Sequence, residues 1–423
     1  MEENQVKPLI LYGAGGNSKT VFQRFVAEGR TPVCFCDGDP VKIGSVWDSG
    51  DGFMLDILSL DDALCRYNNA EFYVTPEAPI KYEIIDKLKE NEIPRNNIIN
   101  HEAYVKRVGC YELESWLQFE RFECISFCCS GTGRSGVIPK VPMLDLSNKD
   151  LHMKCEAIRQ QAMYDLENSI ATGYCYSCPK AVSSYWPEER KIEWIIFGAG
   201  GSCQFNCSYC GGISSSPVAE RKRSVERALS YIKYIRDQKI VDYSTLVQVI
   251  TGEITINPMK EEIIKTFHDH PCIFFTNGEY YSDEIEMVLK KVKSRINCSL
   301  DAGTTDTFKL IKGRDCFSKV CNNLKQYAKH GPIDLKYILI PGLNDGRKDI
   351  VGFFELASEI DARVVLTRDV KGYDNFIHNI DETLETIKFF VKNAKIRDLA
   401  LTNEGFIFDG LYKDRLIEAY NSY

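Results

Sequence analysis

Three cysteines lie on one short stretch of chain, Cys203-Gln-Phe-Asn-Cys207-Ser-Tyr-Cys210, with the spacing CxxxCxxC. Three thiolates on such a loop can bind three irons of a 4Fe–4S cube, because thiolate sulfur is the usual ligand of these clusters. The fourth iron then has no ligand from this motif, and an open metal position usually serves chemistry. The amino and carboxylate groups of a small molecule could fill that position. The same loop could instead bind zinc, or hold a cluster that only transfers electrons.

The elements that must position this loop are alternating strands and helices. The cysteine loop directly follows an apolar strand and a glycine-rich turn at residues 198–201. The predicted strands of this half are Trp194–Phe197, Leu246–Ile250, Cys272–Thr276, Ile296–Leu300, Leu335–Ile340 and Arg363–Leu366. The helical patterns between them are Ser224–Gln238, Met259–His270, Asp283–Lys293, Phe317–His330 and Lys348–Glu359. We predict a partial (β/α)6 barrel over residues 191–423, with its chemistry at the C-terminal ends of the strands.

The cysteine loop, with the aromatic Tyr209 before its last cysteine, resembles the signature of the radical S-adenosylmethionine (SAM) superfamily. The resemblance covers residues 191–423. It implies that SAM fills the open iron position. The implied reaction is reductive cleavage of SAM to a 5′-deoxyadenosyl radical, which removes a hydrogen atom from a substrate. A flavodoxin- or ferredoxin-type reductant is implied as the electron donor.

The resemblance also implies which residues contact SAM. Thr251-Gly252-Glu253 follows the second strand, where the family carries a Gly-Gly-Glu that meets the methionine amino group; the threonine is a departure. Tyr209 and Gly252-Glu253 would hold the adenine and methionine ends of SAM. Glu253 could also be a solvated surface carboxylate.

Two further contacts are implied beyond the later strands. Ser299 and Asp301 end the fourth strand, where family members contact the ribose, although Asp-Ala-Gly also suits a plain turn. Residues 336–342 cover the fifth strand and its exit, a usual place for adenine contacts.

A second group of cysteines precedes the barrel, at Cys124, Cys128, Cys129, Cys175 and Cys178. The CxxC pair Cys175 and Cys178 chelates a metal well, and Cys128 with Cys129 could supply a third ligand. Cys124 or Cys155 could be the fourth. The group resembles the auxiliary-cluster modules of some radical SAM enzymes, although those usually follow the barrel. We therefore expect an auxiliary iron–sulfur cluster, with a structural zinc as the alternative.

The N-terminal segment has the pattern of a dinucleotide fold. A strand at 9–12 is followed by Gly13-Ala-Gly15-Gly16, with Ser18 in place of the third fingerprint glycine, and Asp37 ends the second strand. Backbone N–H groups of such a loop can hold a phosphate, and the acidic residue can accept a ribose hydroxyl. The segment resembles Rossmann-like domains of sugar-modifying and polysaccharide-biosynthesis enzymes, which either bind a nucleotide or act only as a scaffold.

Composition and net charge limit the partners and the location that we expect for the protein. The chain has 17 cysteines and a net charge of −8, from 52 basic and 60 acidic side chains. This balance gives no support to nucleic-acid or membrane binding, and we expect a cytoplasmic protein. We predict three domains: a Rossmann-like domain over 1–107, a Cys-rich module over 108–190 and the barrel over 191–423. The predicted substrate is a small molecule such as a nucleotide sugar or a polysaccharide precursor. The alternative is a nucleotide-binding iron–sulfur electron-transfer or sensor protein without turnover.

Overall fold

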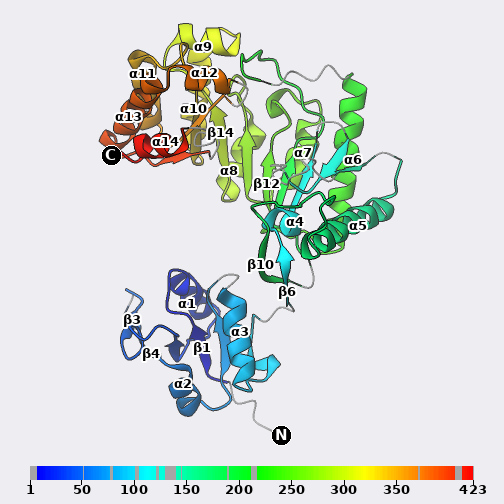
Figure 1. The fold of residues 1–423 in the computed structure, drawn as a ribbon, viewed down its shortest axis with the longest axis vertical. Helices are drawn as coiled ribbons and strands as arrows, with labels where there is room; N and C mark the ends of the chain where they lie inside the picture. Colours follow the sequence, from blue (N-terminus) through cyan, green and yellow to red (C-terminus); the bar gives the residue numbers. More distant parts are fainter. Residues whose placement is uncertain are drawn as a thin grey trace. The chain divides into compact units, whose positions relative to one another are not determined.

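The chain forms two compact units in the computed structural model (Figure 1). The structure describes residues 7–50, 52–76, 80–100, 104–120, 123–128, 140–143, 145–187, 190–210, 217–369, 372–404 and 412–422. One unit is Met1–Gly109 with Ala181–Arg190, and the other is Cys110–Lys180 with Lys191–Tyr423. The predicted middle segment, 108–190, is thus divided between the two units, with most of it in the second.

The first unit is built on a five-stranded sheet with the order β3-β4-β2-β1-β5. Its strands are β1 (Leu9–Tyr12), β2 (Cys34–Cys36), β3 (Val46–Asp48), β4 (Met54–Leu58) and β5 (Glu71–Val74). Its helices are α1 (Ser18–Ala27), α2 (Leu60–Arg66), α3 (Ile80–Glu90) and the short η1 (Arg95–Asn97). All strand pairs are parallel except β3 with β4. A separate antiparallel pair joins β6 (Tyr104–Gly109) to β10 (Val182–Pro187).

The central strand β1 is buried on both faces. Its side chains alternate between two apolar clusters, with Ile10 and Tyr12 in one and Leu9 and Leu11 in the other. This follows from the two-residue period of a strand whose two faces are both covered. The predicted strand at 9–12 is confirmed as β1, and the predicted second strand, before Asp37, is confirmed as β2.

The second unit is built on a ten-stranded sheet with the order β17-β16-β15-β14-β13-β12-β11-β7-β8-β9. Its strands are β7 (Trp116–Phe119), β8 (Cys124–Ser126), β9 (Lys140–Pro142), β11 (Trp194–Phe197), β12 (Leu246–Val249), β13 (Cys272–Phe275), β14 (Arg295–Ser299), β15 (Ile333–Leu339), β16 (Arg363–Arg368) and β17 (Leu401–Asn403). All neighbours from β7 through β11 to β17 run parallel. The predicted strands of this half are confirmed as β11 to β16, and the protein is a mixed α/β fold with parallel sheets.

Helices join these strands, and the predicted helical patterns are confirmed as α6, α7, α8, α10 and α11. The helices of the unit are α4 (Tyr111–Ser115), α5 (Asn148–Glu167), α6 (Val218–Asp237), η2 (Ile254–Ile256), α7 (Lys260–Phe267), α8 (Asp283–Lys291), α9 (Thr305–Lys312), α10 (Phe317–Ala328), α11 (Arg347–Glu359), α12 (Tyr373–His378), α13 (Ile380–Ile396) and α14 (Lys413–Tyr420). Among the described residues, no helix is both long enough and apolar enough to cross a membrane.

Parts of the middle segment pack around a buried arginine. Arg159 of α5 donates from Nη1 to the carbonyl oxygen of Leu113 at 2.5 Å and from Nη2 to that of Trp116. Its guanidinium also lies 4.3 Å from the centre of the Phe127 ring. Because β7 pairs with β11, the sheet of the second unit extends into this segment.

Candidate active site

The cysteine loop lies between β11 and α6, against the C-terminal end of α9. Cys203 and Cys207 are half-buried and Cys210 is exposed. Asn206 N donates to Lys312 O at 3.2 Å, and Ser208 N donates to Ile311 O at 2.9 Å. The loop is therefore fixed by the last turn of α9, a helix that the sequence analysis did not predict.

Local sequence explains where α9 begins and ends. The Thr304 side chain caps the helix by accepting from Thr307 N, and Gly313 ends it in the left-handed region at φ +67°. These are the residue types that favour helix starts and stops. They place the end of α9 beside the cysteine loop.

Gly252 joins the same loop to the end of β12. Its φ is +79°, and a Cβ atom there would lie 2.4 Å from the carbonyl oxygen of Ser202. The neighbouring Glu253 N donates to that oxygen at 2.7 Å, and Ser202 N donates to Thr251 O at 3.1 Å. Only glycine fits this close approach, so Gly252 positions the residue that precedes Cys203.

Glu253 is completely buried, so the surface alternative for this residue is wrong. Its Oε1 accepts from Thr255 N at 3.0 Å and Thr276 Oγ1 at 2.8 Å, and its Oε2 accepts from Asn277 N at 2.6 Å. Burial raises the pKa of Glu253, and these hydrogen bonds oppose the rise. The carboxylate links the ends of β12 and β13 beneath the cysteine loop.

Asn277 is a site residue that the sequence analysis missed. Its Nδ2 lies 3.6 Å from Cys203 Sγ, and its Oδ1 accepts from Glu279 N at 3.0 Å. Hydrogen bonds to cysteine sulfur are among the factors that set the potential of an iron–sulfur cluster. Its position directly beyond a predicted strand was the available signal.

Tyr209, Asp301 and Lys312 form a buried polar group beside the loop. Lys312 Nζ donates to Tyr209 Oη and to Ser299 O, each at 2.6 Å, and forms an ion pair with Asp301. Tyr209 Oη donates to Asp301 Oδ2 at 2.6 Å, and Asp301 Oδ1 accepts from Ile338 N at 2.7 Å.

This arrangement bears on the predicted role of Asp301 as a ribose contact. The residue is fully buried, and both its carboxylate oxygens already accept hydrogen bonds within the protein. The structure thus brings Tyr209, Ser299 and Asp301 together, as the resemblance implied, but through Lys312, which the sequence analysis did not single out. A direct contact between Asp301 and ribose stays a prediction.

An apolar cluster lies next to this group, at the ends of α9 and β15. Ile311, Ile338 and Ile340 form a small buried cluster, against which Tyr209 and Leu343 pack. Two of these isoleucines belong to residues 336–342, where the resemblance implies adenine contacts, and such a contact stays a prediction.

The residues of the loop fit an iron–sulfur cluster. Three thiolates can bind separate irons, and the Asn277 amide donates toward one of them. Burial raises the pKa of the Cys207 thiol, while the Lys312 ammonium lowers it. A cation and a hydrogen-bond donor stabilise the negative charge that thiolate ligands carry.

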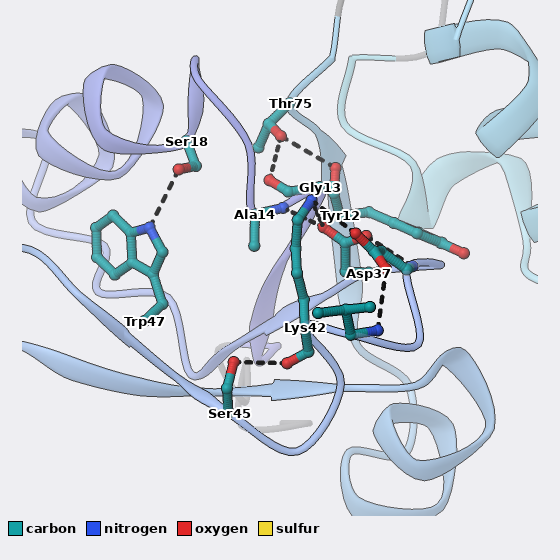
Figure 2. Close-up of polar contacts among 11 residues, drawn as sticks. Tyr12, Gly13, Ala14, Ser18, Asp37, Lys42, Ser45, Trp47 and Thr75 are labelled. Atoms are coloured by element: carbon teal, nitrogen blue, oxygen red, sulfur yellow. Dashed lines mark hydrogen bonds and ion pairs between the residues drawn. The ribbon is translucent and has the colours of Figure 1, made fainter.

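In the first unit, Asp37 ties down the glycine loop (Figure 2). Its Oδ2 accepts from Ala14 N at 2.8 Å and from Lys42 Nζ at 3.2 Å, and its Oδ1 accepts from Asp39 N at 2.9 Å. Burial raises the pKa of Asp37, but the hydrogen bonds from Ala14, Asp39 and Lys42 outweigh it and leave the pKa below its ordinary value. The carboxylate that we predicted to meet a ribose thus binds the loop itself.

The glycines of this loop differ in their surroundings. Gly13 has φ +110°, and a Cβ there would meet Thr75 Oγ1 at 2.6 Å, so the turn requires glycine. Gly15 and Gly16 are exposed, and a Cβ on either would have no heavy atom within 4 Å. Ser18 is buried and accepts from Trp47 Nε1 at 3.1 Å (Figure 2).

The second cysteine group is described in part. Cys129 lies outside the described residues. Cys128, Cys175 and Cys178 are half-buried.

Comparison with known proteins identifies the domain that carries the three-cysteine loop. Residues 199–357 match the model described as Radical SAM superfamily, and this span contains the cysteine loop, Glu253, Asp301 and Lys312. A GTP 3′,8-cyclase from Nautilia profundicola is 22% identical over 278 residues, which cover 55% of this chain and 84% of that protein. The GTPase Obg of Brachyspira hyodysenteriae is 28% identical over 46% of this chain, but over only 31% of its own length.

Among solved structures, Streptococcus suis SuiB bound to S-adenosylmethionine has a TM-score of 0.38 and 12% identity. That alignment covers 66% of this chain and 60% of SuiB. The family has a 4Fe–4S cluster and SAM as its cofactors, and the matched residues contain the three cysteines of the loop. The match over residues 199–357 therefore relates this domain of the chain to the Radical SAM superfamily.

Proposed function

We propose that this chain is an enzyme in which Cys203, Cys207 and Cys210 hold a 4Fe–4S cluster and SAM completes its fourth iron. The observation that carries the proposal is the placement of these cysteines on one loop, fixed between Gly252 and the end of α9. When bound, the cluster and SAM supply a 5′-deoxyadenosyl radical by reductive cleavage of SAM, and this radical abstracts hydrogen from an organic substrate.

In this proposal, the protein's own residues bind the cluster and SAM and orient them. Asn277 donates toward Cys203, and Lys312 holds Tyr209 and Asp301 in place beside Cys207. We propose that Gly252 and Glu253 form the floor for the methionine end of SAM, while Tyr209, Ser299 and the isoleucine cluster border its nucleoside end. Our interpretation of β11 to β16 is a partial (β/α)6 barrel, which places these residues at one end of the parallel strands.

For the substrate, we propose a small molecule with a nucleotide-linked part, such as an activated sugar or a polysaccharide precursor. The exposed, sterically open Gly15 and Gly16 in the first unit support this, because backbone N–H groups there can approach a phosphate. The reaction class that we favour is an oxidation or epimerisation. We further propose a cytoplasmic location and a flavodoxin- or ferredoxin-type protein as the electron donor.

The test is release of 5′-deoxyadenosine and methionine from SAM by the anaerobically reconstituted full chain with dithionite. We expect slow release even without substrate, and Cys203→Ala, Cys207→Ala and Cys210→Ala should each abolish it. The matched control is Cys321→Ala, a half-buried cysteine of α10 outside the loop, which should retain it. A reducible cluster that never yields 5′-deoxyadenosine, with or without candidate substrates, would overturn the proposal in favour of an electron-transfer protein.

A further inference from the structure

A cysteine outside both predicted groups, Cys110, lies where the chain enters the second unit. The antiparallel register of β6 and β10 pairs Gly109 with Val182. Within the second unit, Lys180 forms an ion pair with Glu112. These two contacts on either side bring Cys110 close to Cys178.

Cys175 is held in the same place by a turn. Cys178 N donates to Cys175 O at 3.0 Å, so the CxxC segment folds back on itself and both thiols stay near Cys110. Burial raises the pKa of the Cys175 thiol to about 12, and negative charge on Cys178, Cys110 and Cys128 raises it in turn. Cys128 is among the groups that act on this thiol.

The position of Cys128 has an independent structural reason. The buried Arg159 side chain bonds to the Leu113 carbonyl and stacks on the Phe127 ring. Cys128 directly follows Phe127, and Leu113 lies one helical turn after Cys110. One buried side chain thus fixes the backbone beside both cysteines.

The two cysteines that we predicted as alternative fourth ligands have other neighbours. The thiol of Cys155 is buried, and it bonds to Tyr231. The charged groups around Cys124 are Glu120, Lys140 and Glu123. Of the residues that the structure describes, no cysteine is among the groups that shift the pKa of either thiol.

The geometry points to a second 4Fe–4S cluster bound by Cys110, Cys128, Cys175 and Cys178, with one cysteine for each iron. Four thiolates crowded together repel one another unless metal ions neutralise them, and four cysteines are the usual ligand set of such a cluster. Since every iron has a cysteine, this cluster leaves no open position for SAM or substrate. It is suited to electron transfer or to joining the chain segments that meet there.

A structural zinc is the alternative occupant of the same four thiols, since four cysteines also form a common zinc site. Metal content separates the two, because a cube holds four irons and a structural zinc site holds one ion.

This inference deepens the proposed function, but its test does not depend on SAM cleavage. In the full-length Cys203→Ala/Cys207→Ala/Cys210→Ala chain, reconstituted anaerobically, about four irons per chain should remain. Adding Cys110→Ser should remove most of that iron, as should Cys178→Ser. Adding Cys124→Ser, the matched control from the same segment, should leave the iron content unchanged. Full iron retention in the Cys110→Ser chain, or zinc in place of iron, would overturn the inference.

Two further experiments test whether Cys129 is a ligand and whether the Cys110→Ser chain folds. Cys129→Ser in the same background should keep all the iron, and loss of the cluster there would assign the fourth ligand to Cys129 instead. If circular dichroism shows that Cys110→Ser fails to fold, the Mössbauer spectrum of the Cys129→Ser chain decides. Four irons with all-sulfur coordination leave Cys110 as the fourth ligand, whereas a distinct oxygen- or nitrogen-ligated iron contradicts the inference.

Discussion

The Lys312 ammonium lies 2.6 Å from the Tyr209 hydroxyl, and both groups contact the same carboxylate, that of Asp301. Tyr209 belongs to the cysteine loop, Lys312 ends α9 and Asp301 follows β14. The Lys312 and Asp301 side chains are at most 3% exposed, so this ion pair is almost completely removed from water. Removing either charge would leave the other buried without its partner.

We predict that Lys312→Met destabilises the second unit. Breaking a buried ion pair by removing one partner costs about 3–5 kcal/mol, because the remaining charge is uncompensated. Urea unfolding of the apo chain, followed by hydrogen exchange in residues 199–312, should show an earlier transition. Adding Asp301→Asn should restore part of the loss.

The control is Lys309→Met on the same helix. Lys309 pairs with Asp315 at 3.0 Å, but both side chains are 61% exposed. An exposed pair contributes about 0–1 kcal/mol, so this variant should unfold close to wild type. Equal stability of the two methionine variants would contradict a structural role for Lys312.

Gly252 offers a second prediction with a close control. Gly252→Ala should lower both the stability of the chain and the iron retained by the cysteine loop, because the new Cβ would lie 2.4 Å from the Ser202 carbonyl oxygen. Gly342 has nearly the same φ, +82° against +79°, but open space around the missing Cβ. Gly342→Ala should therefore cost only the left-handed strain of about 1–2 kcal/mol. If iron content and urea midpoint fall equally in both variants, the close approach to Ser202 is unimportant.

The sequence was sufficient for the parts of the site that local pattern determines. The CxxxCxxC spacing and the strands β11 to β16 are local features, because apolar runs and glycine turns mark them directly. Lys312 and Cys110 could not be found in this way. Each gains its role from a segment far away in the chain, Lys312 from Tyr209 of the cysteine loop, and Cys110 from the segment that Lys180 holds against Glu112.

Asp37 illustrates the same limit of prediction from sequence. Its place after β2 is that of a ribose-binding carboxylate in a dinucleotide fold. In the structure, Ala14 N, Asp39 N and Lys42 Nζ already occupy its oxygens. A motif gives the position of a side chain, but the hydrogen bonds that it makes depend on the surrounding loop.

Asn277 should tune the potential of the cluster that we propose for the three cysteines. Asn277→Ala removes the amide that lies 3.6 Å from Cys203 Sγ, so the reduced, more negative cluster loses a stabilising donor. We expect a lower midpoint potential in a potentiometric titration followed by electron paramagnetic resonance. Asn206→Ala, an exposed residue of the same loop, should leave the potential unchanged. A potential that is unaltered in Asn277→Ala would show that this contact does not act on the cluster.

The last prediction concerns the glycine loop of the first unit. Gly15 is exposed, and a Cβ there would meet no heavy atom within 4 Å, so substitutions at this position should not disturb folding. Gly15→Asp places a carboxylate where a phosphate would approach the backbone, and it should abolish nucleotide binding through charge repulsion. Gly15→Asn has nearly the same shape without the charge and should weaken binding less. Isothermal titration of the full chain with a panel of nucleotides and nucleotide sugars measures both effects. Unchanged binding by Gly15→Asp would place the phosphate elsewhere, and no binding by the wild-type chain to any member of the panel would make this unit a scaffold.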